Sequence, residues 1–353
     1  MKAHFPECAL SVDSLLPFQD MEAQIINVCR ALIPELQDAD DSDFDVCRIN
    51  GGITNIMAKV SKKDQSVVVR VFGPATEGVI DRDREIQATC HLSRAGFCPE
   101  LKGVFKNGII QTFVTARTLT PEDFLDDAVV AKVAKELRRL HQQEVPGEKE
   151  SMVWTEINRY FELASAVTKF ESPEDQRKLE AVSFDELRQE INTLKEIGAR
   201  LKGPVVYAHN DLLPGNVMVD AQGKYYFIDF EYSGYNYRGF DIGTHFNEYA
   251  GFDCDFCAYP SKDRQLNFLR HYLRPDDPEK ATHEELEELF VEANFYALAA
   301  HITWSAWAIV QATSSAAIDF DYMSYFFKRM KMYREQKAKF LPVVRGFLAG
   351  KSK

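Results

Sequence analysis

The stretch "HNDLLPGN", residues 209 to 216, decides the fold and the chemistry expected of this chain. Asp211 lies between His209 and Asn216 in the spacing H-x-D-x-x-x-x-N. Further along the chain, Asp229 ends the apolar, strand-like run "KYYFID". Phosphoryl transfer uses one carboxylate to orient and deprotonate a hydroxyl, and an amide with a second carboxylate to hold magnesium on phosphates. Asp211 fits the first role, and Asn216 with Asp229 fits the second.

Turn chemistry is the simpler interpretation of the same stretch, because Asn and Asp side chains often bond nearby backbone groups in loops. The sequence D-F-E at residues 229 to 231 favours the catalytic interpretation, since motif and context then agree. Glu231 would lie beside Asp229, and carboxylates with substrate phosphates suit one or two magnesium ions.

Four other polar residues near these motifs receive supporting roles. His209 is grouped with the catalytic residues because it is expected to brace the loop by hydrogen bonds, while Asp211 acts as the base. Asp241, in "FDIG", is expected to tie the loop to the helical core. His245 and His301 are expected to be satisfied core histidines.

Size and charge limit the class of protein. With 353 residues the chain exceeds the usual size of one compact domain, which favours two lobes. A hydrophobic fraction of 45% with 27% charged residues is typical of a globular protein. The net charge of -12 argues against nucleic acid as a partner, because that binding depends on clustered Lys and Arg. A negative surface instead suits a small cationic substrate.

The sequence predicts neither export nor membrane insertion. The N-terminus lacks the basic flank and apolar core of a secretory signal. The most apolar stretch, residues 295 to 310, is shorter than a membrane span and contains polar residues. Seven scattered cysteines and no N-x-S/T acceptor predict a reducing, cytoplasmic location. Cys254 and Cys257 form a lone C-x-x-C without the further ligands that zinc needs, so packing is expected there.

The pattern of apolar residues changes along the chain. Residues 44 to 115 contain strand-like runs and one helix, residues 81 to 96, which begins with acidic residues and stops at a glycine. Beyond residue 115 helices dominate. Thr120 and Pro121 suit a helix start, residues 184 to 202 form another helix, and the chain is helical from Gly251 onward. A small sheet-rich lobe and a larger helical lobe are therefore expected.

Three motifs, "HNDLLPGN", "IDFEYSGYNYRGFDIGTHFNEYAG" and "WSAWAIVQA", resemble the eukaryotic choline and ethanolamine kinase family. The resemblance extends over about residues 51 to 325, and "EYSGYNY", "HFNEYAG" and the two leucines of the loop are nearer the ethanolamine kinase branch. It implies an α+β, two-lobed protein-kinase-like fold of the choline kinase and aminoglycoside phosphotransferase type, with a small antiparallel-sheet N-lobe. The expected domains are an N-terminal helical segment at 1–43, a nucleotide-binding N-lobe at 44–115 and a helical C-lobe at 116–353.

The resemblance also implies a nucleotide loop at "GGITN", residues 51 to 55. Gly51 and Gly52 would let the backbone approach phosphate, with Thr54 and Asn55 as donors. A simple turn is the alternative for paired glycines. Arg70, on a strand, would hold phosphate oxygens with its planar fork, where protein kinases have a lysine.

Three further residues complete the expected nucleotide site. Glu85 would form an ion pair that positions the strand arginine, although acidic residues near helix starts are as often solvated charges. Thr112 and Val114 lie in the segment 111–115, which is expected to be the hinge that contacts adenine. The chain has no G-x-G-x-x-G and has D-F-E where protein kinases have D-F-G, which argues for a small-molecule hydroxyl as acceptor.

Trp304 and Trp307 are candidates for binding an ammonium group. They share one helix face, and a tryptophan face attracts such a cation by about 0.5 to 2 kcal/mol. Core packing is the ordinary interpretation of a tryptophan pair in an apolar helix. The resemblance instead implies an amine pocket in which Glu248 and Tyr325 join the tryptophans, with Tyr322 as the competitor of Tyr325.

These features together predict a kinase that uses ATP and Mg2+ to phosphorylate ethanolamine, with choline as a further substrate, in phospholipid synthesis. Choline kinase proper is the first alternative. A phosphotransferase for aminoglycosides or sugars, and an inactive scaffold that binds nucleotide or a partner, are the others. Dimers are common in the family. The preferred amine, the number of magnesium ions, the oligomeric state and the role of the first 40 residues stay open.

Overall fold

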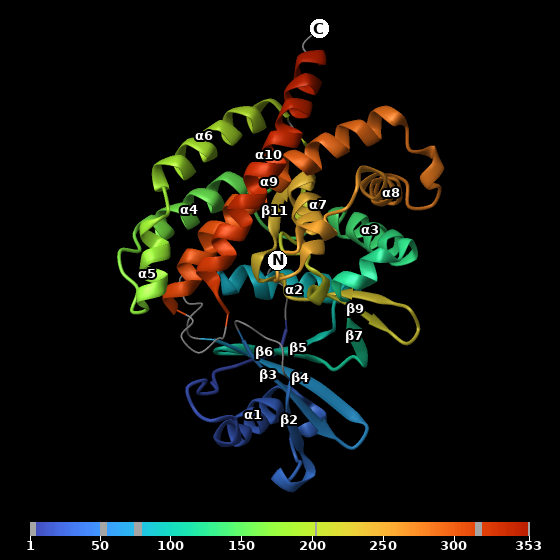
Figure 1. The fold of residues 1–353 in the computed structure, drawn as a ribbon. Helices are drawn as coiled ribbons and strands as arrows, with labels where there is room; N and C mark the ends of the chain where they lie inside the picture. Colours follow the sequence, from blue (N-terminus) through green and yellow to red (C-terminus); the bar gives the residue numbers. More distant parts are fainter. Residues whose placement is uncertain (1–4, 50–54, 74–79, 202, 315–319, 352–353) are drawn as a thin grey trace. The chain divides into compact units, whose positions relative to one another are not determined.

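The computed structural model divides the chain into two compact units, whose elements are labelled in Figure 1. One unit comprises Met1–Arg117 and Met218–Tyr232, and the other comprises Thr118–Val217 and Ser233–Lys353. Within these units the structure describes residues 5–49, 55–73, 80–201, 203–314 and 320–351. In these ranges no helix combines the length and the apolar character needed to cross a bilayer.

The first unit is built on a six-stranded sheet in the order β1-β5-β6-β4-β3-β2. Most neighbouring strands are antiparallel, as expected. The exception is β1, which pairs with β5 in parallel, so the sheet is mixed. The physical reason is that a short N-terminal strand adds to the free edge of β5. The strands are β1 (Glu7–Cys8), β2 (Asp45–Ile49), β3 (Asn55–Lys62), β4 (Gln65–Phe72), β5 (Leu101–Phe105) and β6 (Gly108–Thr112).

The two faces of this sheet carry different side chains, because successive residues of a strand point to opposite sides. Val69 and Val71 of β4 pack in a buried cluster with α1 (Phe18–Leu32). Arg70 and Phe72 therefore point to the other face. There Phe72 packs with Cys90 of α2 (Arg82–Arg94), so the alternation of β4 aims Arg70 toward the α2 side.

Helix α2 confirms the helix expected over residues 81 to 96. The side chain of Asp81 accepts the backbone N–H of Arg84 at 3.0 Å, which caps the first turn. After the helix Gly96 has a φ of +80°, a left-handed conformation that favours glycine. The unit also contains most of a three-stranded sheet in the order β10-β9-β7, formed by β7 (Ala116–Thr118), β9 (Val217–Asp220) and β10 (Tyr225–Phe227).

The second unit is mainly helical, as expected. One short antiparallel pair, β8 with β11, precedes the candidate loop and α7. Its elements are α3 (Asp127–His141), α4 (Val153–Ser165), α5 (Pro173–Glu180), α6 (Phe184–Leu201), β8 (Val205–Ala208), β11 (Gly234–Tyr237), α7 (Arg238–Asn247), α8 (Lys262–Leu273), α9 (His283–Ser314) and α10 (Tyr322–Gly350).

The helix expected to begin at Thr120 begins later. Thr120 caps only a 3-10 turn, Pro121–Leu125. Asp126 is extended, and its side chain accepts the backbone N–H of Ala128 at 2.8 Å, which makes it the cap of α3. Two strong N-cap residues thus stand close together, and the second one starts the α-helix.

Helix α9 forms the centre of the second unit and packs against α4, α7 and α10. After its charged first turns, residues 289–311 are all buried, as expected of a helix segment surrounded by others. Helix α7 approaches it closely: a Cβ on Gly243 would lie 2.4 Å from the backbone oxygen of Ala293. This contact holds α7 against the helical core. Asp241 lies near the first end of α7, and Glu248 directly follows its last residue.

Candidate active site

The loop that carries Asp211 is anchored to α7 by Asp241, as expected. Oδ2 of Asp241 accepts the backbone N–H of His209 at 2.7 Å, and Oδ1 accepts that of Asn210 at 2.8 Å. Asn210 has a φ of 65°, a left-handed conformation that asparagine tolerates. His209 is thus held through its backbone, and its side chain is fully buried. The backbone that directly precedes Asp211 is therefore fixed.

Asp241 is itself part of a buried chain of polar groups. Its Oδ2 lies 2.9 Å from Nε2 of His141, and Nδ1 of His141 lies 2.7 Å from the Tyr272 hydroxyl. Burial raises the pKa of Asp241, but hydrogen bonds and charges of His141 and His209 outweigh burial and lower the pKa below its ordinary value. The anchor therefore stays a carboxylate and keeps both oxygens available as acceptors.

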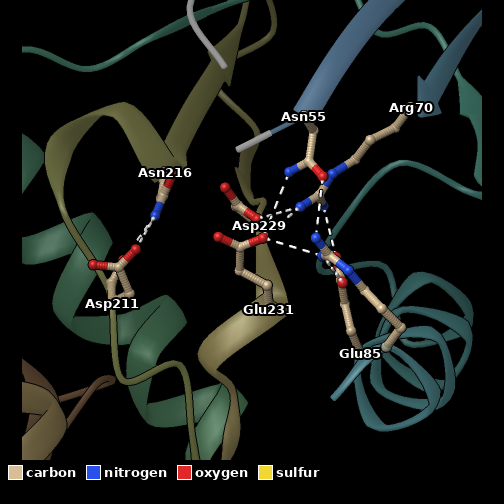
Figure 2. A network of polar contacts seen from close by, with 8 residues as sticks. Asn55, Arg70, Glu85, Asp211, Asn216, Asp229 and Glu231 are labelled. Atoms are coloured by element: carbon tan, nitrogen blue, oxygen red, sulfur yellow. Dashed lines mark hydrogen bonds and ion pairs between the residues drawn. The ribbon is translucent and has the colours of Figure 1, made fainter. Parts of the chain in front are cut away.

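Asn216 closes the same loop around Asp211. Its amide Nδ2 donates to the backbone oxygen of Asp211 at 2.8 Å and to Oδ2 of the carboxylate at 3.1 Å, as Figure 2 shows. Asn216 is buried, whereas Asp211 is partly exposed. The amide nitrogen is used inside the loop, which leaves the amide oxygen, the atom type that magnesium prefers.

His245 supports the loop from the helical core. Its Nδ1–H donates to the backbone oxygen of Leu212 at 2.8 Å. Burial lowers its pKa to about 4, so the ring is neutral under ordinary conditions. His301 is also buried, and burial lowers its pKa well below the ordinary value. A hydrogen bond with the Gln336 side chain opposes that shift.

In the first unit, Arg70 gathers three carboxylates (Figure 2). Nη1 lies 2.8 Å from Oε1 of Glu85, and Nη2 lies 2.7 Å from Oδ1 of Asp229 and 3.1 Å from Oε2 of Glu231. The expected pair between Arg70 and Glu85 is thus present. Glu85 is only 1% exposed, so its interpretation as a solvated helix charge is wrong.

A second arginine, Arg82, enters this cluster and is not among the residues predicted from the sequence. Its Nη1 lies 2.6 Å from Oε2 of Glu85 and 3.2 Å from Oε2 of Glu231. Its guanidinium lies 4.2 Å from the centre of the Phe72 ring. Residues three apart share a helix face, so the spacing of Arg82 and Glu85 is a signal that could have identified it.

The carboxylates of this cluster offer suitable ligands for a divalent cation. Oxygens of Glu85, Asp229 and Glu231 lie within 4.8 Å of one another, and magnesium prefers oxygen ligands. Asp229 has a left-handed φ of 65° and a side chain that is 32% exposed. Such strain is concentrated at functional sites. Three carboxylates against two guanidinium groups leave an excess negative charge.

The pKa values of Glu231 and Arg70 are both raised, for different reasons. Burial raises the pKa of Glu231 to about 7, Asp229 adds to the rise, and Arg70 opposes it. For Arg70 burial lowers the pKa, but Asp229, Glu85 and Glu231 outweigh burial and raise the pKa above its ordinary value. Arg70 therefore remains a cation that can hold phosphate oxygens.

The expected nucleotide residues lie at the ends of strands of the first unit. Gly51, Gly52 and Thr54 lie outside the described residues. Asn55 opens β3, and its Nδ2 is 3.5 Å from Oε2 of Glu231. Thr112 ends β6, where its backbone N–H donates to the oxygen of Glu100 at 2.9 Å, and Val114 lies between β6 and β7.

In the second unit, the tryptophans of α9 form a cluster with α10. The rings of Trp304 and Trp307 meet edge to face, with their centres 5.5 Å apart. Both tyrosine candidates flank Trp307: the centre of Tyr322 lies 5.7 Å away and that of Tyr325 lies 6.5 Å away. All four side chains are more than nine-tenths buried. The pair is thus packed in an aromatic cluster, and aromatic faces attract ammonium groups electrostatically.

Tyr325 is the tyrosine that connects this aromatic cluster with acidic groups. Burial raises its pKa well above the ordinary value; the charge of Arg329 opposes this, and those of Glu248 and Asp211 add to it. The ring of Tyr325 also lies 5.5 Å from the guanidinium of Arg329, which bonds the carboxylate of Glu248. This contact links Tyr325 to the acidic residue expected in the amine pocket.

Glu248 lies directly after α7, in a 3-10 turn, Glu248–Ala250. Its Oε1 lies 2.7 Å from Nη1 of Arg329 on α10. The two residues are 5% and 1% exposed, so the pair is buried. Arg329 is a residue that the sequence does not reveal, because its partner is far away along the chain.

The candidate catalytic residues thus form two sets, one in each unit, and both sets contain residue types that kinases use. Asp211 and Asn216 belong to the helical unit, and Arg70, Glu85, Asp229 and Glu231 belong to the unit with the sheet. A strand arginine paired with a helix glutamate, a loop with Asp and Asn, and a D-F-E carboxylate pair define the class of kinase-like phosphotransferases.

Comparisons with known proteins give the family. Residues 46–334 match the model of the choline/ethanolamine kinase family. The chain is 48% identical over 338 residues to a probable ethanolamine kinase of Arabidopsis thaliana, with 94% of this chain and 90% of that protein covered. It is 36% identical over 325 residues to probable ethanolamine kinase A of Dictyostelium discoideum, with 90% and 92% covered. The chain belongs to the choline/ethanolamine kinase family.

A solved structure gives the same result for the fold. An ethanolamine kinase of Plasmodium vivax superimposes with a TM-score of 0.80 at 29% sequence identity and covers 91% of both chains. The predicted two-lobed, kinase-like fold is confirmed.

Proposed function

We propose that this protein is an ATP-dependent ethanolamine kinase. It transfers the terminal phosphoryl group of ATP to the hydroxyl of ethanolamine and yields phosphoethanolamine and ADP, a step in phospholipid synthesis. The observation that carries this proposal is that Trp304 and Trp307 pack with Tyr325, whose ring lies 5.5 Å from the Arg329 guanidinium that holds Glu248. All of these residues belong to the unit that also carries Asp211. Ethanolamine joins a hydroxyl and an ammonium group by two carbons, which matches a base and a cation-binding cluster in one unit.

Asp211 orients the substrate hydroxyl and accepts its proton on a carboxylate oxygen as the oxygen attacks phosphorus. Its position is held by Asn216 at 3.1 Å and by the anchor at Asp241. Arg70, held by Glu85 at 2.8 Å, binds phosphate oxygens of the nucleotide. Asn55 donates to the phosphates, and the segment with Thr112 and Val114 contacts adenine. Gly51, Gly52 and Thr54, expected in the same nucleotide loop, lie outside the described residues.

Asn216, Asp229 and Glu231 would hold magnesium. The fit rests on the chemistry of the donors: carboxylate oxygens of Asp229 and Glu231 within 4.8 Å of each other, and an amide oxygen not used inside its loop. When bound, the ion neutralises negative charge on the phosphates. Arg70 and Arg82 form ion pairs with the same carboxylates.

Glu248, Trp304, Trp307 and Tyr325 bind the ammonium group. Aromatic faces attract any ammonium ion, including the quaternary ammonium of choline. The Glu248 carboxylate can also accept hydrogen bonds from a primary ammonium, which choline cannot donate. This difference favours ethanolamine over choline.

The test measures ADP release from ATP and magnesium with ethanolamine, choline, an aminoglycoside and a sugar at equal concentrations. Ethanolamine should give the highest kcat/KM and choline a lower one. Release with the aminoglycoside or sugar alone would refute the amino-alcohol assignment, and no release with any acceptor would favour an inactive scaffold.

The remaining expectations concern location and assembly. All seven cysteines lie in the described part of the chain and are free thiols, which suits a reducing, cytoplasmic location. A homodimer is the assembly that the family resemblance implies, and light scattering during gel filtration would test it.

A further inference from the structure

The buried pair of Arg329 and Glu248 is built in an unusual way. A guanidinium group has five N–H donors, yet only Nη1 of Arg329 bonds Glu248, at 2.7 Å. In the described ranges of the chain, Nε and Nη2 of Arg329 have no hydrogen-bond partner. Each unsatisfied buried donor costs free energy, so the pair is poorly suited to stabilising the fold.

Another ion pair in the same unit, in which Glu292 is buried and Arg238 is partly buried, shows the contrast. Arg238 binds Glu292 with two parallel bonds, Nε to Oε2 at 2.8 Å and Nη2 to Oε1 at 2.7 Å. Both oxygens of Glu292 are therefore occupied. Glu248 is held through Oε1 alone, and Oε2 bonds to none of the residues that the structure describes.

Arg329 also contacts the aromatic cluster. Its guanidinium lies 5.5 Å from the centre of the Tyr325 ring and 6.0 Å from that of Phe256. One side chain thus touches both Glu248 and Tyr325, two of the groups proposed to bind the ammonium. Replacement of a buried ion pair by apolar residues often leaves stability unchanged or improved, which points to a role in the site.

We propose that Arg329 is a positioning residue for amine recognition, and this inference rests on the proposed function. By holding Oε1 of Glu248, Arg329 fixes the carboxylate so that Oε2 is presented to the substrate ammonium. By lying against Tyr325, it also fixes that ring. Arg329 itself does not touch the substrate.

Two variants test the proposal, R329M and R329K. Without the guanidinium the carboxylate of Glu248 can rotate, so R329M should raise KM for ethanolamine about 10- to 100-fold. Its kcat and its KM for ATP should change less than about threefold, because Asp211 and the nucleotide groups are untouched. R329K keeps the charge but loses the planar fork, and its KM should rise only about threefold.

Binding is measured separately from turnover. Titration of tryptophan fluorescence with ethanolamine, without ATP, should show the same loss of affinity in R329M. The matched control is R238M, which breaks the other ion pair and should destabilise the protein without a selective rise in KM for ethanolamine. An equal rise in R238M, or wild-type affinity in R329M, overturns the proposal.

The remaining outcomes are also decisive. If R329M does not fold, a wild-type KM in R329K overturns the proposal, and a threefold rise supports it. If the wild type releases no ADP with any amino alcohol, the proposed function fails. If the wild type is active and E248Q weakens ethanolamine binding while R329M does not, only the role of Arg329 fails.

Discussion

The anchor at Asp241 allows a prediction worked directly from its contacts. In D241N one carboxylate oxygen becomes an NH2 group. Placed at Oδ2, this group would face both the His209 N–H and the His141 ring; placed at Oδ1, it would face only the Asn210 N–H. The second orientation is less costly, and it leaves one buried N–H without an acceptor.

The expected effect of D241N on stability follows from the loss of the hydrogen bond to the Asn210 backbone N–H. A hydrogen bond to a charged group is worth about 1.5 to 3 kcal/mol, so the free energy of unfolding should fall by about 2 to 3 kcal/mol. A misplacement of Asp211 by about 1 Å should lower kcat about 100-fold. Urea unfolding followed by circular dichroism measures the first quantity, and ADP release measures the second.

The control is D126N, because Asp126 caps α3 by accepting the backbone N–H of Ala128 at 2.8 Å. Asparagine caps helices as well as aspartate, so D126N should retain both stability and kcat. Wild-type kcat in a D241N protein that has lost the predicted stability would refute the idea that Asp241 positions the loop. An unchanged free energy of unfolding in D241N would refute the predicted loss of stability.

Three further variants test other parts of the site. D211A should lower turnover by orders of magnitude and retain nucleotide binding, as measured by ADP release and nucleotide titration; near-normal turnover would exclude Asp211 as the base. R82M leaves Glu85 and Glu231 with Arg70 as their remaining guanidinium partner and should lower the free energy of unfolding by about 3 kcal/mol; an unchanged urea midpoint would contradict this. Burial lowers the pKa of His245 from 6.5 to about 4, so the folded state binds this proton less readily than the unfolded state. Its contribution to stability is therefore complete above pH 6.5 and is lost as the pH falls toward 4, by about 3 kcal/mol. In H245N, which can keep a donor to Leu212, urea unfolding at several pH values should show a smaller loss; equal slopes would refute the assignment.

Local patterns predict much of the site. The spacing of Asp211 and Asn216 and the position of Asp229 after an apolar run are short-range features, so they are visible in the sequence. The pair of Arg70 and Glu85 is expected from the resemblance to kinases, and burial of Glu85 decides against a solvated helix charge. Arg82 is missed, although its spacing from Glu85 indicates a shared helix face.

Other features depend on groups far apart along the chain. Arg329 meets Glu248 because α10 and α7 both pack against α9, and no sequence spacing encodes that meeting. The same holds for the contact between Arg329 and the Tyr325 ring, which joins the aromatic cluster to the buried ion pair. The start of α3 at Asp127 instead reflects competition between two good caps, which propensity cannot resolve.

The sequence by itself determined the kinase class, and it predicted the loop with Asp211 and the carboxylates proposed to bind metal, because these reside in short motifs whose chemistry follows from residue type and spacing. Only the tertiary structure decided that Asp241 anchors the loop, that Glu85 is buried and that Arg329 holds Glu248 by one oxygen. The physical reason is that burial and charge pairing are properties of packed helices and strands. They arise when residues that are distant in the chain become buried against one another.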